Sequence, residues 1–201
     1  MAHLVLRSNG KPLSRLSSFE DYDPGDGSLQ AKADVSDVIA MGLRFLEPSE
    51  APKALKLDST GNVAQIIEGA NGSLIVEAQV KDIIEAVDPD RHQFLPIAVL
   101  GRSGSPVDGT WFLLNVHVKQ ASIVDGDSDV EPSFGYQETR ARMQLKMFAR
   151  NVRLNRDALS SDIHLWREDR YGRVLMMSDA LKKRFEIERI HPLRTIPAIE
   201  V

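Results

Sequence analysis

The feature that most constrains the fold is a strand–helix–strand pattern between residues 74 and 100. A short apolar run at residues 74–76 indicates a strand, and apolar residues from 80 to 87 then recur at the spacing of one helix face. Asp88-Pro89 ends the helical pattern, because proline cannot continue a helix. Residues 94–100 follow as a second strand, so this part of the chain predicts a helix packed on a sheet.

The same pattern recurs when the sequence is shifted by 101 residues without a gap. Apolar positions of the first unit meet apolar positions of the second, and four aligned pairs are identical. These pairs are Leu74 and Leu175, Lys81 and Lys182, Glu85 and Glu186, and Pro96 and Pro197. Either the strand–helix–strand unit occurs twice, or two unrelated segments share the ordinary pattern of such a unit.

Residues 94–100 and 110–118 are two strand candidates separated by a loop rich in glycine, serine, proline and aspartate at 101–109. We expect them to pair antiparallel. Alternation in the second strand predicts one core face and one half-polar face. Pro96 has no N–H to donate, so its strand is expected at a sheet edge or to begin near that residue.

The C-terminal part predicts a further strand, a hairpin and a helix. Residues 143–147 alternate as in a strand, and residues 163–167 and 173–177 flank a turn. Ser178 stands where a helix N-cap is expected, with Leu181 on the buried side of the helix that follows.

Two segments have weaker patterns. Residues 35–46 are mostly apolar and predict either a helix or a strand packed on the main body. Residues 125–138 are acidic, contain glycine and are almost aperiodic, which favours a mobile loop.

Size and composition predict a single α+β domain with an antiparallel or mixed sheet and packed helices. The chain has 201 residues, of which 42% are hydrophobic and 27% charged, as in an ordinary globular protein. Its formal net charge of -4 lacks the positive field that dominates nucleic-acid binding, so no nucleic-acid partner is expected. The sequence has no cysteine, no secretory leader pattern and no apolar run long enough to span a bilayer. We therefore expect a soluble, cytoplasmic protein without a membrane partner.

The sequence lacks the motifs of the common catalytic and metal sites. The aspartates at 21–26 and 125–129 do not complete a calcium loop, because Lys32 and Tyr136 stand where the closing glutamate is needed. The five histidines lack a zinc-binding spacing, and no phosphate-binding glycine loop occurs. We expect no catalytic, cofactor-binding or metal-binding residues, and a protein that is not an enzyme.

Two acidic loops are the best candidates for contact with a basic protein partner. Complementary charge speeds the association of two proteins, although a solvated surface is the simpler interpretation at any one of these positions. Trp111 and Trp166 lie in strand patterns and are expected in the core rather than in such a contact. The candidate contact residues are Glu20, Asp21, Asp23 and Asp26 in the first loop and Asp125, Asp127, Asp129 and Glu131 in the second.

Four blocks of sequence carry a resemblance to a known family. They are DRHQFLPI from Asp90, WFLLNV from Trp111, HLWR from His164 and RVLMMSDALK from Arg173. Together they make the chain similar to an immunity-protein family of bacterial polymorphic-toxin systems, formerly a domain of unknown function and named after a myxobacterial member. The resemblance covers residues 65–195.

The resemblance implies an antitoxin that binds and neutralises a cognate secreted toxin, delivered by contact-dependent or type VI-like secretion. It divides the chain into a variable N-terminal segment at 1–62, packed on the main body, and an immunity-family domain at 63–201. The matching residues look structural, so they imply no toxin contact. Family members often carry serine at the start of the first helix, where this chain has Glu77 and so loses the preferred cap.

Other functions stay open at this point. A small-molecule-binding or enzymatic accessory protein of a toxin gene cluster would need a deep pocket with convergent polar groups, whereas an antitoxin needs a large contact surface. A chaperone-like protein of a secretion cluster would bind the toxin without protecting the cell. The sequence does not indicate the toxin or the oligomeric state.

Overall fold

The strand–helix pattern at residues 74–87 folds as the sequence predicts. In the computed structural model, β5 (Leu74–Glu77) leads directly into α2 (Ala78–Val87), and β13 (Leu175–Ser178) leads into α3 (Asp179–Ile187). The structure describes residues 1–6, 16–20, 35, 38–57, 63–69, 73–124, 126–132, 143–145, 151–171, 173–190 and 194–201.

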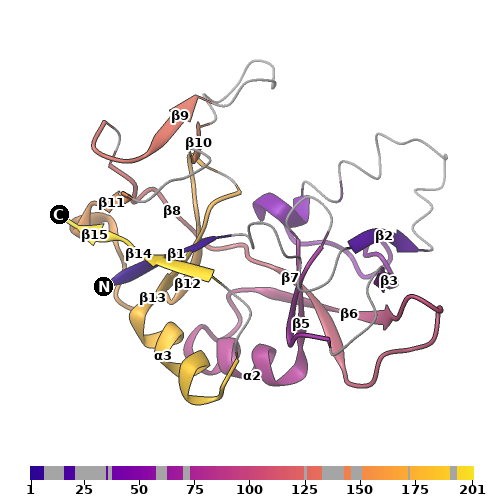
Figure 1. The fold of residues 1–201 in the computed structure, drawn as a ribbon. Helices are drawn as coiled ribbons and strands as arrows, with labels where there is room; N and C mark the ends of the chain where they lie inside the picture. Colours follow the sequence, from indigo (N-terminus) through magenta and orange to yellow (C-terminus); the bar gives the residue numbers. More distant parts are fainter. Residues whose placement is uncertain are drawn as a thin grey trace.

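Two sheets contain most of the strands (Figure 1). The larger has the order β2-β3-β6-β7-β5-β4 and the smaller the order β14-β1-β13-β12-β8, and both mix parallel with antiparallel pairs. The fold is therefore α+β with mixed sheets, as predicted. The other strands of the larger sheet are β2 (Leu16–Glu20), β3 (Ala54–Leu57), β4 (Ile66–Glu68), β6 (Gln93–Leu100) and β7 (Trp111–Asn115). Those of the smaller sheet are β1 (Ala2–Leu6), β8 (Lys119–Gln120), β12 (Leu165–Glu168) and β14 (Arg194–Pro197).

Two short strand pairs, one 3-10 turn and the helical residues 38–41 lie outside the two sheets and the helices α2 and α3. The strand pairs join β9 to β10 antiparallel and β11 to β15 parallel. Their bounds are β9 (Val130–Pro132), β10 (Met143–Leu145), β11 (Arg153–Leu154) and β15 (Ile199–Glu200), and the 3-10 turn spans Arg156–Ala158.

Four strands of each sheet share one arrangement. The order β6-β7-β5-β4 of the larger sheet corresponds to β14-β1-β13-β12 of the smaller. In each, the strand before the helix and the strand after it are not neighbours, because a middle strand lies between them. β7 pairs antiparallel with both β5 and β6, and β1 pairs antiparallel with both β13 and β14. The strand–helix–strand unit suggested by the sequence therefore occurs twice, and a middle strand completes each unit.

The register of the two middle strands is also the same. In the larger sheet, Phe112 of β7 pairs with Val76 on one side and with Pro96 on the other. In the smaller sheet, His3 of β1 pairs in the same way with Met177 and Pro197. Both aligned pairs are 20 positions apart (96 − 76 and 197 − 177). However, β7 follows its unit in the sequence, whereas β1 comes from the other end of the chain. The N-terminal strand thus completes the C-terminal unit.

The two units share one hydrophobic core. α2 packs against α3, and a cluster of buried residues joins both sheets through these helices (Figure 1). A second cluster covers the opposite face of the larger sheet and a third the opposite face of the smaller. Burial on both faces explains why the central strands are apolar at successive positions. Equivalent positions of the two units meet in the shared cluster: Leu74 and Leu175, Val76 and Met177, Val80 and Leu181, and Ile84 and Phe185.

Both faces of β7 are buried, which corrects the expectation of one core face and one half-polar face. Leu114 packs in the shared cluster, and Trp111 and Leu113 pack in the second cluster. Asn115 is polar but fully buried. Part of the cover over this second face comes from residues 39–46, which lie far away in the sequence, so local alternation could not reveal it.

Pro96 lies in an interior strand, because β6 sits between β3 and β7. β6 begins close to Pro96, as one alternative predicted, but the expectation of an edge strand is wrong. Ala98 donates its N–H to the Lys53 carbonyl at 2.8 Å, where pairing with β3 starts. Nitrogens two residues apart point to the same side of a strand. The nitrogen of Pro96 therefore points toward the residues that precede β3, where the two strands are not yet paired. The missing N–H of proline thus removes no hydrogen bond between β3 and β6.

The two segments with weak patterns contain regular structure. Residues 38–41 are helical, and Ile39 is fully buried in the second cluster, which decides between the helix and the strand. Val130–Pro132 forms β9, so the prediction of a loop throughout residues 125–138 is wrong there. The partner of β9 lies outside that segment, at residues 143–145, and local periodicity carries no signal of such a pairing.

The C-terminal hairpin and helix cap are confirmed. β12 pairs antiparallel with β13, and the Leu181 N–H donates to Oγ of Ser178 at 3.1 Å. Glu77, the equivalent residue before α2, forms no side-chain cap. Trp111 and Trp166 are both buried, as expected for core residues.

Candidate functional site

Residues 38–50, which we call the junction segment, connect the two sheets. Arg167 of β12 donates from Nη2 to the Ile39 carbonyl at 3.3 Å. Asn115, at the end of β7, donates from Nδ2 to the Arg44 carbonyl at 2.8 Å. Because β12 belongs to the smaller sheet and β7 to the larger, the segment is bound to both.

Gln93 and Gly42 fix the backbone of the junction segment. Oε1 of Gln93 accepts the Leu46 N–H at 2.9 Å, and its Nε2 donates to the Leu46 carbonyl at 2.6 Å. Gly42 has a φ of +57°, and a Cβ atom there would lie 1.9 Å from the carbonyl oxygen of Val116. Glycine alone fits such a position. The stretch from 42 to 46 is therefore held in one conformation.

Two large apolar side chains of the junction segment face solvent. Leu43 is 45% exposed and Phe45 is 50% exposed, although Met41 and Leu46 on either side of them are buried. The Phe45 ring stacks on His117, with ring centroids 4.5 Å apart and an interplanar angle of 28°. Their exposure therefore follows from a fixed backbone and not from a loose one.

An ion pair crosses the junction segment. Arg44 donates to Glu50 through Nη2 at 2.6 Å and Nη1 at 2.8 Å, which is the two-pronged geometry of a strong arginine–carboxylate pair. Glu50 also accepts the Glu47 N–H at 2.8 Å. The hydrogen bond from Arg44 is the main cause that lowers the pKa of Glu50 to about 2. The Glu47 side chain is exposed and forms no ion pair with a residue that the structure describes.

Asp88, at the C-cap of α2, connects the two units on the helix side. Its buried carboxylate accepts the N–H of His164 at 3.0 Å and that of Leu165 at 2.7 Å, and it lies 3.5 Å from Nε2 of His92. Burial acts to raise the pKa of Asp88, but the His92 imidazole and the two backbone N–H groups outweigh it and hold the pKa below its ordinary value. The role of the Asp88 carboxylate is structural, because its side chain is closed off from solvent and holds two backbone N–H groups.

Ser178 and His164 have the spacing of a nucleophile and a base, with Oγ and Nδ1 2.9 Å apart. The Ser178 hydroxyl, however, already caps α3 through the Leu181 N–H. Asp88 binds the backbone of His164 and not its ring. Within the described residues this pair therefore lacks the orienting carboxylate of a catalytic triad.

Glu168 is a second buried carboxylate that holds backbone groups. Its Oε2 accepts the N–H of Ser122 at 2.7 Å, the hydroxyl of Ser122 at 2.8 Å and the N–H of Ile123 at 3.0 Å. Nε of Arg170 lies 3.6 Å from the other oxygen. This carboxylate fixes the chain after β8 against β12, and it is fully buried.

Two of the acidic residues proposed from the sequence lie on strands of different sheets. Glu20 ends β2 in the larger sheet and Glu131 lies in β9, and these strands lie on opposite sides of Figure 1. Asp127 forms an exposed ion pair with Arg153 at 3.3 Å, and Asp129 accepts a backbone N–H at 3.0 Å. The remaining candidates, Asp21, Asp23, Asp26 and Asp125, lie outside the described residues.

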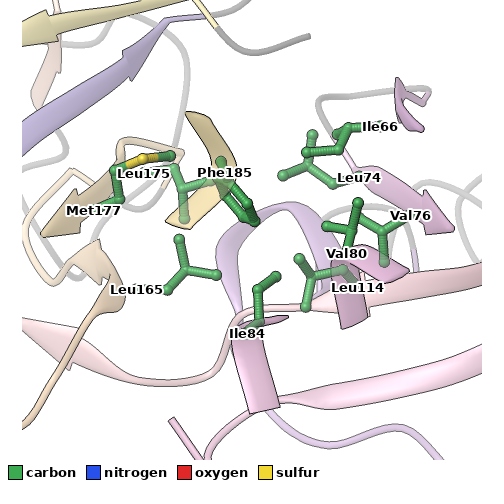
Figure 2. Close-up of a pocket in the computed structure, with 10 residues that line it drawn as sticks. All are labelled: Ile66, Leu74, Val76, Val80, Ile84, Leu114, Leu165, Leu175, Met177 and Phe185. Carbon is green, nitrogen blue, oxygen red and sulfur yellow. The ribbon is translucent and has the colours of Figure 1, made fainter. Parts of the chain in front are cut away.

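A small cavity lies between the two units, where side chains from α2, α3 and both sheets converge (Figure 2). All ten of its lining side chains are apolar. A ligand site typically adds a few convergent polar groups to an apolar wall, and this cavity has none among its lining residues. It is a gap in the shared core.

The described residues contain neither a metal centre nor a membrane-spanning helix. No group of three or more histidine, aspartate or glutamate side chains is placed to hold a metal ion among the described residues. No described helix is both long enough and apolar enough to cross a membrane.

Sequence reasoning missed Leu43 and Phe45 as surface residues, because residues 35–46 are mostly apolar and indicate burial. The available signal was Gly42 followed by Leu-Arg-Phe, in which one charged residue separates two apolar ones. That pattern shows a turn but not which side chains remain outside.

Comparison with known proteins identifies the family. The model of the immunity protein family Imm11 matches residues 9–198, which include both strand–helix–strand units and the junction segment. No curated protein matches the chain. The family resemblance suggested by the sequence is thus confirmed, and this chain belongs to the immunity protein family Imm11.

Proposed function

We propose that this chain is the antitoxin of a polymorphic toxin system and neutralises one cognate secreted toxin by binding it directly. The observation that supports this best is the match to the immunity protein family over residues 9–198. In this proposal the toxin is delivered by contact-dependent or type VI-like secretion, and the antitoxin meets it in the cytoplasm. Binding is stoichiometric and includes no chemical step.

The geometry supports a role in binding. Asp88, Glu168 and Ser178, which could serve catalysis elsewhere, each hold backbone N–H groups of the fold. The cavity between the units is apolar throughout. The junction segment, in contrast, presents side chains from a rigid backbone, as a protein-binding surface does.

The acidic loops are proposed to steer a basic toxin toward the antitoxin. Asp127 supports this role because its side chain is 61% exposed, so its ion pair with Arg153 is only a surface contact. Changing the eight candidate carboxylates to amides should slow association and flatten its dependence on salt. An unchanged association rate with unchanged salt dependence would rule out steering by these loops.

The antitoxin role is tested by co-expression in a bacterial host with the toxin encoded by the adjacent reading frame. We expect this chain alone to restore growth and to form a 1:1 complex with the purified toxin. The Asp82→Ala variant is a matched control, because Asp82 is exposed on α2, and it should protect as well as the unchanged chain. Loss of growth despite abundant folded antitoxin would contradict the proposal.

A further inference from the structure

Leu43 and Phe45 expose apolar surface from a backbone that the fold holds in place. Gln93 and Asn115 are bonded to backbone groups of this stretch, and neither bond buries the two apolar side chains. Polar residues at positions 43 and 45 would keep the same backbone bonds and would be better hydrated. The stack of Phe45 on His117 belongs to the fold, but the stability of the fold does not explain the exposed parts of these two side chains, which contact with a partner would bury.

The pair is also organised before any partner arrives. The stack on His117 restricts the Phe45 ring, and the positive φ of Gly42 fixes the turn that precedes Leu43. A side chain that is already ordered loses little conformational entropy on binding. Aromatic residues, phenylalanine included, are enriched at the core of protein interfaces.

The charges around the pair indicate the chemistry of the partner. Arg44 and Glu50 neutralise each other through two hydrogen bonds, so a partner can cover them without burying an unpaired charge. Glu47 has no ion pair with a described residue, and the chain carries a net charge of -4. A protein that covers this surface must therefore offer an apolar hollow with a cationic side chain beside it.

We propose that Leu43 and Phe45 are the apolar anchor by which this chain docks on its toxin, in an apolar hollow with a basic rim. This inference rests on the proposed antitoxin function and adds the contact surface to it. The anchor belongs to the segment that is bound to both sheets, so both units support its position.

The test measures the Kd for the purified toxin domain encoded by the adjacent reading frame, using isothermal titration calorimetry. The L43A/F45A double variant should weaken binding by at least about tenfold, because truncation of an interface anchor commonly has an effect of that size or larger. Ile187→Ala is the matched control, since Ile187 is an exposed apolar residue on α3 (72% exposed), and it should leave the Kd unchanged.

Leu43→Glu provides a second variant that leaves the stack of Phe45 on His117 in place. It puts a charge into the proposed apolar hollow, where the charge would be buried without a partner, so it should also weaken binding by at least about tenfold. Circular dichroism melting curves establish that each variant keeps its fold. Together, the two anchor variants separate the loss of apolar contact from any effect of the lost stack.

The outcomes distinguish this inference from the proposed function. If the unchanged chain binds the toxin and both anchor variants bind it within about twofold, the anchor is refuted while the antitoxin function stands. If the unchanged chain neither binds nor protects, the antitoxin function fails and the anchor with it. Glu47→Gln should slow association at low salt, and an unchanged rate would refute the basic rim.

Discussion

Asp88→Ala should lower the free energy of unfolding more than most substitutions in this protein, although Asp88 lies outside the proposed toxin contact. The side chain is 0% exposed, and it joins the end of α2 in the first unit to the start of β12 beside the second. Alanine leaves the N–H groups of His164 and Leu165 without their acceptor in a site that water does not reach. An unsatisfied buried donor costs about 1–3 kcal/mol, and the bonds lost here end on a charged group. We expect the free energy of unfolding to fall by about 3–5 kcal/mol.

Urea unfolding followed by circular dichroism measures this loss, with Asp82→Ala as the control. Asp82 is exposed on the same helix, so its removal should change the free energy of unfolding by less than about 0.5 kcal/mol. If Asp88→Ala lowered the stability by less than about 1 kcal/mol, water or a rearranged backbone would have to satisfy the two N–H groups. The reasoning from burial would then be wrong.

The same carboxylate predicts how stability depends on pH. Its pKa in the folded protein lies below the ordinary value of 3.8, so the folded state favours the ionised form. The contribution of Asp88 is then fully present above that ordinary value and is lost as the pH falls through the lowered pKa. The unchanged protein should lose stability more steeply than Asp88→Ala in acid, and equal slopes would refute this assignment.

Four further substitutions, one of them a control, test other parts of the fold by thermal melting. Ser178→Ala removes the cap of α3 and should destabilise the protein by about 1 kcal/mol, whereas Glu77→Ala, at a cap position without a side-chain bond, should have almost no effect. Gly42→Ala places a methyl group against the Val116 carbonyl at a positive φ, so a loss below about 1 kcal/mol would contradict the described turn. Glu168→Ala leaves buried N–H groups unpaired and should destabilise by about 3–5 kcal/mol, and a melting temperature equal to that of the unchanged protein would show that this carboxylate is dispensable.

The parts of the fold that could be predicted are those specified by neighbouring residues. The strand and helix at residues 74–87 are set by apolar spacing and by the proline that stops the helix, and the cap at Ser178 depends on a bond to a residue three positions away. The echo between residues 74–100 and the segment 101 positions later was also visible in the sequence. These signals are local, so tertiary structure did not override them.

The parts that could not be predicted depend on residues distant in sequence. Nothing near Ala2–Leu6 indicates that this strand inserts between β13 and β14, because its partners lie at the other end of the chain. The exposure of Leu43 and Phe45 is of the same kind. It follows from bonds to Gln93 and Asn115 in the larger sheet, and an apolar segment by itself indicates burial.

The two units are connected at two places, and this raises the question of whether both connections support the proposed toxin-binding surface. The junction segment connects the sheets on one side, and Asp88 connects α2 to β12 on the other. If the protein unfolds as one cooperative unit, Asp88→Ala lowers its stability but leaves most molecules folded, and the affinity for the toxin stays within about twofold of the unchanged value. If the units separate locally, the anchor at Leu43 and Phe45 loses its support in a fraction of molecules, and the apparent affinity falls by that fraction.

Calorimetric titration of Asp88→Ala with the toxin domain, at a temperature well below the melting transition of the variant, decides between cooperative unfolding and local separation of the units. The shared core between α2 and α3 favours the cooperative unit, and a weakened affinity of the folded variant would refute that expectation.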